Sequence, residues 1–278
     1  MSPTAVIRFQ TPLPDTMLPM TLSNILGSTV RMGQLLVQRR EPAWVTRDSS
    51  TGGWIHRWHG GTFVSPRARG IAWRAAEAGT RELFCHEYQP VGGDVVVELG
   101  AGYGTETVTL SRMVGPSGRV IAVEAHPWTC ELLRATIKAN ALENVEVVNA
   151  AAVGRDGPVT LSDRRDDTLI NSLAAEGVTV EGVTLDTLVT RFELTQINLL
   201  KINIEGAERV AVEGMEAAIH LVRHAVISCH DFRADAGDGE WFRTSRDIDA
   251  ALARWDFTSF TRDEDPRPWV SGYRYASR

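Results

Sequence analysis

One acid and three alternate glycines stand together at residues 98–104, in the order Glu-Leu-Gly-Ala-Gly-Tyr-Gly. Glycines at this spacing let the backbone turn sharply and press against a ligand that any Cβ would obstruct. The helix expected to begin near Gly104 would offer free N–H groups to an anionic group. A second acid, Glu124, follows Gly104 by twenty residues. At that distance the acid of a nucleotide-binding unit accepts hydrogen bonds from a ribose diol.

The charges around these glycines favour one ligand class. The spacing is G-x-G-x-G, whereas dinucleotide-binding enzymes carry G-x-G-x-x-G. Glu98 would repel a pyrophosphate but attract an ammonium group. S-adenosylmethionine has a ribose, a carboxylate, an ammonium and a sulfonium but no phosphate, so the pattern predicts this molecule. Each acid alone could be an ordinary strand-end carboxylate, but the two acids with the glycines between them favour a cofactor site.

Three further residues are candidates for catalysis. Methyl transfer from a sulfonium mainly requires alignment of nucleophile, methyl carbon and sulfur, and a hydroxyl nucleophile is helped by a base with a pKa near neutrality. His230 follows an expected strand and is the candidate base, with Asp231 orienting it. Glu205, or Glu208 at the same edge, would bind an acceptor amine or act as a base. The ordinary alternatives are a backbone-bonded histidine, and carboxylates at Glu205 and Glu208 that a helix start favours.

Strands and helices alternate from about residue 67 onward, and this order would position the candidate residues. The sequence predicts strands at 95–99, 119–123, 145–148, 199–204 and 225–229, an inserted hairpin at 159–161 and 178–180, and short strands at 257–260 and 272–275. It predicts helices at 67–88, 104–114, 127–142, 207–221 and 245–255. Such alternation predicts a doubly wound, mostly parallel α/β sheet with its ligand at the carboxyl ends of the strands.

The N-terminal segment has a different texture. Residues 1–65 are predicted to form an extension to a cofactor-binding domain at 66–278, with a helix-like stretch at 22–37 and a strand-like run at 54–58. Trp44, Trp54 and Trp58 in this extension are too large to be left bare. We expect them to pack against the main domain or a second subunit, or to line a lid over a substrate.

Composition limits the classes of partner. The chain of 278 residues has a net charge of −6, which argues against nucleic acid or anionic lipid held by bulk charge. No apolar run approaches the roughly 20 residues that span a bilayer. The three cysteines lack any metal-ligand spacing and are expected to be small buried hydrophobes in a reducing cytoplasm. We therefore expect a cytoplasmic protein without nucleic acid or membrane partners, plausibly a homodimer.

Several separated stretches resemble one enzyme family. They are residues 95–106, 120–127, 144–154, 183–188 and 200–208. Together they are similar to the FkbM-type S-adenosylmethionine-dependent methyltransferases, over roughly residues 90–232. The resemblance implies a seven-stranded class I methyltransferase (Rossmann-like) sheet, S-adenosylmethionine as cofactor, and O-methylation of a small molecule such as a sugar or natural product.

The resemblance also implies the residues of the cofactor site. The glycines would flank the methionine end, Glu124 would hold the ribose, and the segments at 125–126 and 149–151 would lie beside the adenine. The implied set is Glu98, Gly100, Ala101, Gly102, Tyr103, Gly104, Glu124, Ala125, His126, Asn149, Ala150, Ala151 and Asn203. The family usually has Asp where this chain has Asn203. Because Asn lacks the charge and is a poor ligand for a hard cation, a divalent-metal site is in doubt.

Four functions stay open at this stage. The leading hypothesis is methylation of a hydroxyl on a small-molecule acceptor. An amine acceptor, as on an amino acid or peptide, is the first alternative, because it needs no metal. The others are a nucleotide-dependent oxidoreductase and a non-catalytic cofactor-binding protein.

Overall fold

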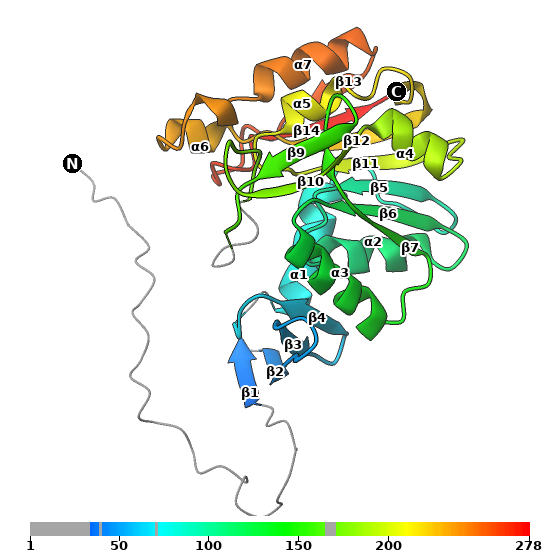
Figure 1. Cartoon of the computed structure of the whole chain (residues 1–278). Coiled ribbons are helices and arrows are strands. Elements are labelled where there is room, and N and C mark those ends of the chain that lie inside the picture. The colour runs from blue at the N-terminus through cyan, green and yellow to red at the C-terminus, as the bar shows by residue number, and fades with distance from the viewer. Residues whose placement is uncertain (1–33, 39–40, 70–71, 165–170) are drawn as a thin grey trace, which may run out of the picture. The chain divides into compact units, whose positions relative to one another are not determined.

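A seven-stranded sheet forms the centre of the computed structural model, which describes residues 34–38, 41–69, 72–164 and 171–278. Its strands are β5 (Val95–Leu99), β6 (Arg119–Glu124), β7 (Val145–Asn149), β11 (Ile197–Ile202), β12 (Val222–Ser228), β13 (Thr258–Phe260) and β14 (Tyr273–Ser277). They lie in the order β13-β14-β12-β11-β5-β6-β7 (Figure 1). Neighbouring strands from β12 to β7 are parallel, and β14 is antiparallel to β12 and β13. The predicted doubly wound, mostly parallel sheet is confirmed.

Successive residues of the central strands are buried on opposite faces of the sheet. Val96 and Val120 contribute to one apolar cluster, whereas Val97 and Ile121 contribute to the other. A strand that is covered on both faces must be apolar at nearly every position. This requirement explains the unbroken apolar runs from which the strands were predicted.

Helices cover both faces of the sheet (Figure 1). The cluster on one face includes side chains from α2 (Thr105–Val114) and α3 (Pro127–Ala139). The other cluster includes side chains from α4 (Leu185–Arg191), α5 (Glu208–Val212) and α7 (Ser245–Arg254). The remaining helical segments are α1 (Trp73–Gly79), α6 (Asp231–Asp235), the π-helical turn η2 (Thr80–Phe84), and the 3₁₀ turns η4 (Ile219–Leu221) and η5 (Glu240–Phe242).

Two predicted helices are shorter in the structure. The helix predicted at 207–221 ends at Val212, and Gly214, two residues later, lies so close to Val153 that a Cβ there would stand 2.4 Å from the Val153 carbonyl oxygen. The helix predicted at 67–88 begins at Trp73 and changes into the π-helical turn η2 at Thr80. Helical periodicity alone does not predict either of these helix ends.

The N-terminal part of the described chain is a four-stranded antiparallel sheet. Its strands are β1 (Gln34–Gln38), β2 (Glu41–Arg47), β3 (Trp54–Arg57) and β4 (Thr62–Ser65), paired in chain order. The strand-like run at 54–58 is confirmed. The helix-like stretch predicted at 22–37 is wrong over residues 34–37, which form a strand, and its remainder lies outside the described residues.

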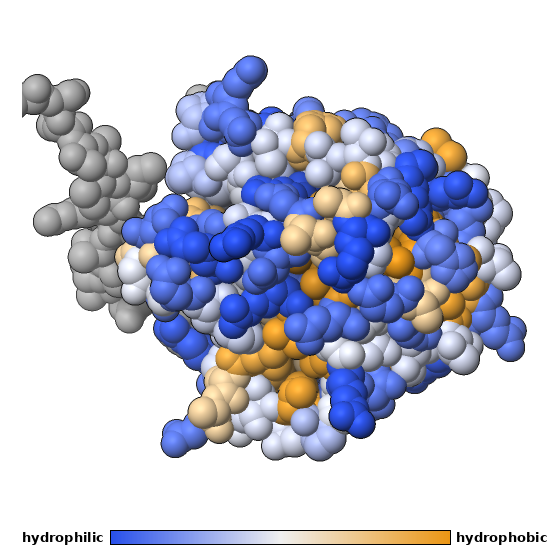
Figure 2. Space-filling model, turned by 90° about the horizontal axis from the view of Figure 1, so that it is seen from above, coloured by the Kyte–Doolittle hydropathy of each residue, from blue (hydrophilic) through white to orange (hydrophobic). Residues whose placement is uncertain are grey.

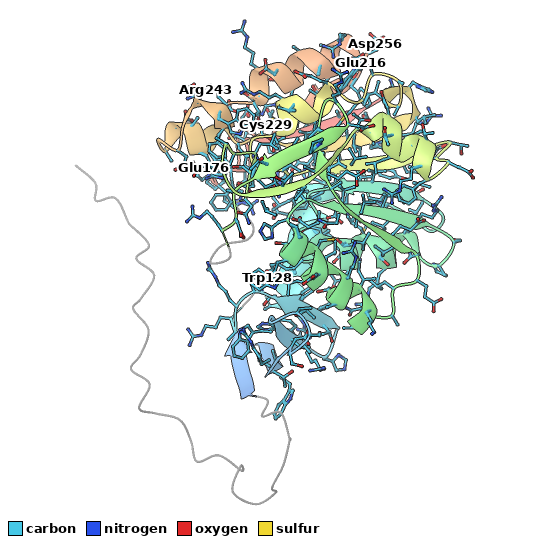
Figure 3. The ribbon with its side chains drawn as sticks, viewed as in Figure 1. Trp128, Glu176, Glu216, Cys229, Arg243 and Asp256 are labelled. Carbon is cyan, nitrogen blue, oxygen red and sulfur yellow. The ribbon has the colours of Figure 1, made fainter. Side chains whose placement is uncertain are left out.

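Hydrogen bonds join this sheet to α3. The backbone N–H of Val64 donates to Thr136 Oγ1 at 2.9 Å, and that of Thr62 donates to Asn140 Oδ1 at 3.0 Å. Trp128, which Figure 3 labels on α3, donates its indole N–H to the carbonyl of Thr51 at 2.8 Å. The edge strand β4 therefore finds its partners on a helix of the main domain.

The tryptophans of the extension differ in their surroundings. Trp58 is buried against Phe63, Trp73 and Val108, and Trp54 packs at the margin of the same cluster, as expected for packing on the main domain. Trp44 is 49% exposed. A role for residues 1–65 as a lid or a dimerisation segment stays a prediction.

A small sheet follows the third parallel strand. It contains β8 (Ala151–Ala152), β9 (Gly157–Leu161) and β10 (Val178–Val183), in the order β8-β10-β9. Strands β9 and β10 pair antiparallel, which confirms the predicted hairpin.

The cysteines and the surface agree with the composition. Cys85, Cys130 and Cys229 are free and fully buried, as predicted. The face seen from above is mostly hydrophilic and carries separate hydrophobic patches (Figure 2). Among the helices of the described segments, none has the length and apolar character needed to cross a bilayer.

Candidate active site

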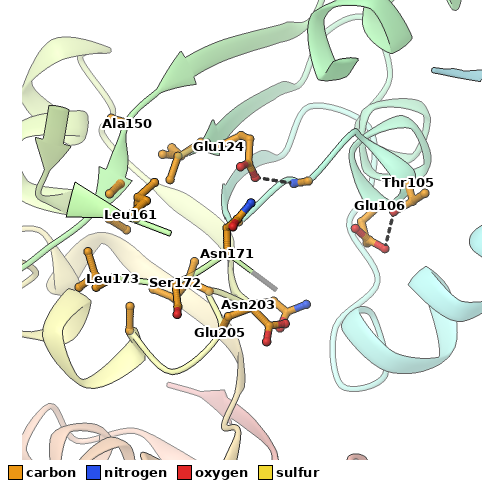
Figure 4. Close-up of a pocket in the computed structure, with 18 residues that line it drawn as sticks. Thr105, Glu106, Glu124, Ala150, Leu161, Asn171, Ser172, Leu173, Asn203 and Glu205 are labelled. Atoms are coloured by element: carbon orange, nitrogen blue, oxygen red, sulfur yellow. Dashed lines mark hydrogen bonds between the residues drawn. The ribbon is translucent and has the colours of Figure 1, made fainter. Parts of the chain in front are cut away.

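A cavity of about 220 Å³ opens where β5, β6 and β11 end (Figure 4). Loops at the carboxyl ends of parallel strands are the usual ligand site of such sheets. Eight of the predicted site residues line the cavity: Gly100, Gly102, Glu124, Ala125, Ala150, Ala151, Asn203 and Glu205.

The loop after β5 is held tightly against its neighbours. The N–H groups of Gly100 and Ala101 both donate to the carbonyl of Val123, at 2.9 and 3.0 Å. Gly100 has a φ of +82°, and a Cβ there would lie 2.0 Å from the carbonyl oxygen of Asn203. Only glycine can occupy this position without moving β11 away from β5.

Three other predicted loop residues face away from the cavity. Ala101 is fully buried, and Tyr103 packs with Val64 and Leu132 beneath the N-terminal sheet. Gly104 lies against α3, where an added Cβ would stand 2.9 Å from Leu133 Cδ1. These residues shape the loop from behind, and their side chains do not line the cavity.

Glu98 does not face the cavity, which corrects the expectation that it attracts a ligand ammonium. Its side chain is 0% exposed and forms an ion pair with Lys201 Nζ at 3.2 Å. Its other oxygen accepts a hydrogen bond from Thr107 Oγ1 at 2.6 Å. The side chain points into the protein, where its partners are Lys201 and Thr107.

Glu124 is the predicted acid that does face the cavity. Its Oε2 accepts a hydrogen bond from the Gly102 N–H at 2.9 Å (Figure 4), and its Oε1 accepts one from the His126 N–H at 2.9 Å. Burial raises the pKa of Glu124 to about 7, against the two backbone hydrogen bonds, which lower it. Each carboxylate oxygen keeps a lone pair, so this side chain can accept hydroxyl hydrogen bonds from a ribose.

Apolar side chains form the side of the cavity beyond Glu124. Ala125, Ala150 and Ala151 line it as predicted, together with Leu161 and Leu173 from the small sheet and its loop. In Figure 4 the labelled Ala150, Leu161 and Leu173 lie together on the side away from Glu106. A flat, apolar ring such as adenine fits these surroundings.

His126 and Asn149 stand behind this apolar side and do not line it. The His126 ring is 3% exposed, and its Nε2 lies 3.1 Å from Asp163 Oδ1. Asn149 donates to the carbonyls of Glu124 and Ala125, at 2.9 and 3.0 Å. Both residues therefore fix the backbone that carries Glu124 and Ala125.

Polar side chains gather at the end of β11. Asn203 and Glu205 lie close together in Figure 4, and Glu106 lies across from them at the start of α2. Glu205 has a φ of +53°, which is a strained conformation for a residue with a side chain. Among the described residues that line the cavity, every charged side chain is a carboxylate: Glu106, Glu124 and Glu205.

His230 cannot serve as the predicted general base. Its ring is 3% exposed and lies between two carboxylates, with Nδ1 2.9 Å from Glu208 Oε1 and Nε2 3.4 Å from Glu205 Oε1. Burial acts to lower the pKa of His230, but Glu208 and Glu205 outweigh it and raise the pKa to about 10. At neutral pH the ring is a cation with no lone pair to accept a proton.

Asp231 is also not catalytic in this geometry. Its carboxylate accepts hydrogen bonds from the N–H groups of Thr244 and Ser245, at 2.9 and 3.0 Å, and from Ser245 Oγ at 2.6 Å. It thus pairs free N–H groups at the start of α7 and does not orient the His230 ring.

The sequence reasoning missed part of the lining. The omitted residues are Thr105, Glu106, Val123, Ala152, Leu161, Leu173, Ile204 and Ala207. Glu106 directly follows the glycine loop and could have been inferred from the helix start. Leu161 and Leu173 reach the cavity only because the small sheet folds over it, which no local pattern indicates. Asn171 and Ser172 also line the cavity.

The chemistry of these residues fits S-adenosylmethionine. The cavity combines glycines that allow close backbone approach, a carboxylate for the ribose diol, an apolar side for the adenine, and no lining cation among the described residues. In the same residues, no group of three or more His, Cys, Asp or Glu side chains is arranged to hold a metal ion. That Asn203 disfavours a divalent-metal site stays a prediction.

A family model for the methyltransferase FkbM domain matches residues 98–259, more than half of the chain. The chain belongs to the FkbM methyltransferase family. The match confirms the predicted family and the assignment as an S-adenosylmethionine-dependent methyltransferase, and it argues against the oxidoreductase alternative. The predicted domain bounds, 66–278, stay a prediction.

Curated relatives match this FkbM methyltransferase over short stretches. Protein-L-isoaspartate O-methyltransferase 2 of Archaeoglobus fulgidus is 43% identical over 66 residues, which make up 24% of this chain and 30% of the relative. The probable cobalt-precorrin-6B C(15)-methyltransferase (decarboxylating) of Sulfolobus acidocaldarius is 35% identical over 60 residues, 22% of this chain and 31% of the relative. The matched stretches thus span about a third of each relative's length.

Solved structures with a similar fold include another FkbM protein. The crystal structure of methyltransferase FkbM from Methylobacillus flagellatus has a TM-score of 0.47 at 18% identity, covering 66% of this chain and 43% of that chain. Aeropyrum pernix fibrillarin, solved with natively bound S-adenosyl-L-methionine, has a TM-score of 0.46 at 14% identity, covering 89% of this chain and 100% of that chain.

Replacing Gly100 by alanine should abolish tight cofactor binding. The new Cβ would collide with the Asn203 carbonyl oxygen, and the left-handed backbone would be strained by about 1–3 kcal/mol. We expect the dissociation constant for S-adenosylhomocysteine to rise at least ~10-fold in calorimetry, with lower thermal stability. Gly92→Ala is the control, because an added Cβ there meets no atom within 4 Å. Equal binding by both variants would contradict the proposed loop geometry.

Cofactor affinity should fall as the pH drops through 7. The pKa of Glu124 is raised to about 7, so its carboxyl is ionised above this pH and protonated below it. The protonated form loses acceptor capacity for the ribose hydroxyls, and one linked proton weakens binding by up to ~10-fold per pH unit. Calorimetry with S-adenosylhomocysteine between pH 6 and 8 would measure this dependence. Glu124→Gln should bind weakly at both pH values and lose the dependence; a wild-type profile in that variant would refute the assignment.

Proposed function

We propose that this FkbM methyltransferase O-methylates a hydroxyl group of a small, uncharged acceptor such as a sugar or natural product. The observation that carries the proposal is the fixed carboxylate of Glu205 at the polar end of the cavity, beside Asn203. A hydroxyl needs a hydrogen-bond acceptor that remains ionised at neutral pH, and Glu205 is such a group.

Two cations hold Glu205 in its ionised form. Arg233 Nη1 donates to Glu205 Oε2 at 2.7 Å, and His230 Nε2 lies 3.4 Å from Oε1. Burial acts to raise the pKa of Glu205, but the hydrogen bonds and charges of His230 and Arg233 outweigh it and lower the pKa. The carboxylate is therefore a fixed anion.

The turn that carries Glu205 is itself fixed from below. Glu208 is fully buried, and its Oε1 accepts hydrogen bonds from the N–H groups of Ile204 and Gly206, at 3.2 and 3.3 Å. The same oxygen pairs with His230. His230 thus acts as a positioning residue. One ring nitrogen contacts Glu208, which holds the turn at 204–206, and the other contacts the side chain of Glu205 in that turn.

These contacts define the roles of the residues in the reaction. Bound S-adenosylmethionine would supply an electrophilic methyl group. Gly100, Gly102 and Glu124 would hold the cofactor, and Asn203 and Glu205 would orient the acceptor hydroxyl. Transfer would exchange the methyl–sulfur bond for a carbon–oxygen bond and leave S-adenosylhomocysteine, while Glu205 would accept the hydroxyl proton, so that the acceptor would leave as a neutral ether.

An amine acceptor is the second candidate, and one observation favours it. Because the charged side chains lining the described cavity are all carboxylates, an ammonium compound would be attracted to it. The same lining would repel a carboxylate substrate, which distinguishes the expected acceptor from the protein L-isoaspartate in the name of the Archaeoglobus fulgidus relative.

An acceptor screen with methyl-labelled S-adenosylmethionine tests the proposal. The panel should hold sugars, phenols and other natural-product alcohols, their amine analogues and their carboxylate analogues, with the product bond assigned by NMR. Label in an ether supports the proposal, and label on nitrogen supports the second candidate. Turnover of carboxylates alone would contradict both, and cofactor binding without any turnover would favour a non-catalytic protein.

Glu205→Gln should separate chemistry from cofactor binding. Loss of the proton acceptor is expected to lower kcat by ~10²–10⁴-fold, whereas affinity for S-adenosylhomocysteine should change by less than about 3-fold. Glu143→Gln, an exposed change elsewhere, is the control. Unchanged turnover in Glu205→Gln would show that another group accepts the proton.

A further inference from the structure

A lysine lies inside the apolar run of β11, directly beneath the cofactor loop. Lys201 is 0% exposed, and it stands opposite Glu98 in the register of β11 and β5. A buried ammonium group is costly unless it is paired and hydrogen-bonded. Neither the cavity lining nor the proposed proton transfer uses this side chain.

The Lys201 ammonium has three partners. Its shortest contact is a hydrogen bond of 2.6 Å to the carbonyl oxygen of Gly100. Glu98 Oε1 lies 3.2 Å from Nζ, and the ring centroid of Phe84 lies 4.9 Å away. The lysine therefore joins a backbone carbonyl of the cofactor loop to a buried carboxylate.

The contact with Gly100 completes the support of one peptide group. The N–H of Ala101, at the other end of the Gly100–Ala101 peptide, donates to the carbonyl of Val123. The next N–H in the loop, that of Gly102, donates to Glu124. Lys201 and Val123 thus hold the two ends of the peptide that precedes the contact with Glu124, and they come from β11 and β6.

We propose that Lys201 is a positioning residue for the cofactor, which sets the orientation of the Gly100–Ala101 peptide by holding its carbonyl. When the carbonyl is held, the Gly102 N–H is placed to donate to Glu124, and the loop keeps the conformation that binds the cofactor. Without Lys201 this peptide loses the partner of its carbonyl, and the loop gains alternative orientations. The proposal concerns cofactor affinity, so it does not depend on which acceptor is methylated.

A simpler role would be charge compensation for Glu98 alone. The two roles make different predictions for a variant in which both charges are removed. If Lys201 only neutralises Glu98, two neutral side chains of similar size should restore both stability and cofactor binding. If Lys201 positions the loop, stability should recover but cofactor binding should not.

The test therefore uses Lys201→Met, Glu98→Gln and the double variant Lys201→Met/Glu98→Gln in the full chain. Affinity for S-adenosylhomocysteine is measured by calorimetry and stability by denaturant unfolding. We expect Lys201→Met to lose both, because it leaves Glu98 buried without a cation. The double variant should regain stability yet bind at least ~10-fold more weakly than wild type, as expected when a charged donor is lost from a buried carbonyl.

Glu98→Gln is the matched control, because it keeps the hydrogen bond from Lys201 to Gly100. It should lose stability while binding S-adenosylhomocysteine within about 3-fold of wild type. The proposal is overturned if the double variant binds like wild type, or if Glu98→Gln binds as weakly as Lys201→Met. A double variant that cannot fold would also overturn it, because Lys201 would then be required for the fold itself.

Discussion

The close approach of the loop after β5 to the end of β11 is the constraint on which the site depends. A Cβ on Gly100 would lie 2.0 Å from the Asn203 carbonyl oxygen, so the two strand ends can meet only through glycine. The same approach brings Gly100, Gly102, Asn203 and Glu205 to one cavity. Sequence segments a hundred residues apart therefore act as one site.

Buried charge fixes this arrangement at two levels. Below the loop, Lys201 pairs with Glu98 and with the Gly100 carbonyl. Beside the cavity, His230 lies between Glu205 and Glu208. Neither Lys201 nor His230 lines the cavity. The residues they hold, Gly100 and Glu205, do line it. Buried ion pairs of this kind add little net stability. Each nevertheless favours the geometry in which both partners meet, because separating them would leave an uncompensated buried charge.

Sequence patterns predicted the features that depend on residues close together in the chain. Apolar runs located the parallel strands, and the glycine spacing with Glu124 located the cofactor end, because each follows from a single segment. The role of His230 could not be derived in this way. Its position at the sheet edge was right, but Glu205 and Glu208, which make it a cation, follow a different strand. Gly214, just after α5, likewise packs against the distant Val153, a contact that no local pattern indicates.

The proposed chemistry is better served by the fixed carboxylate of Glu205 than by the neutral histidine base that the sequence predicted. During methyl transfer, positive charge leaves the sulfur and develops on the acceptor atom before the proton departs. A cation at this point would oppose the change, whereas a preorganised carboxylate stabilises it. In the proposed function Glu205 has this task, and its backbone is strained, with φ at +53°. His230 assists best by remaining protonated behind it, which keeps Glu205 ionised as the charge on the acceptor rises.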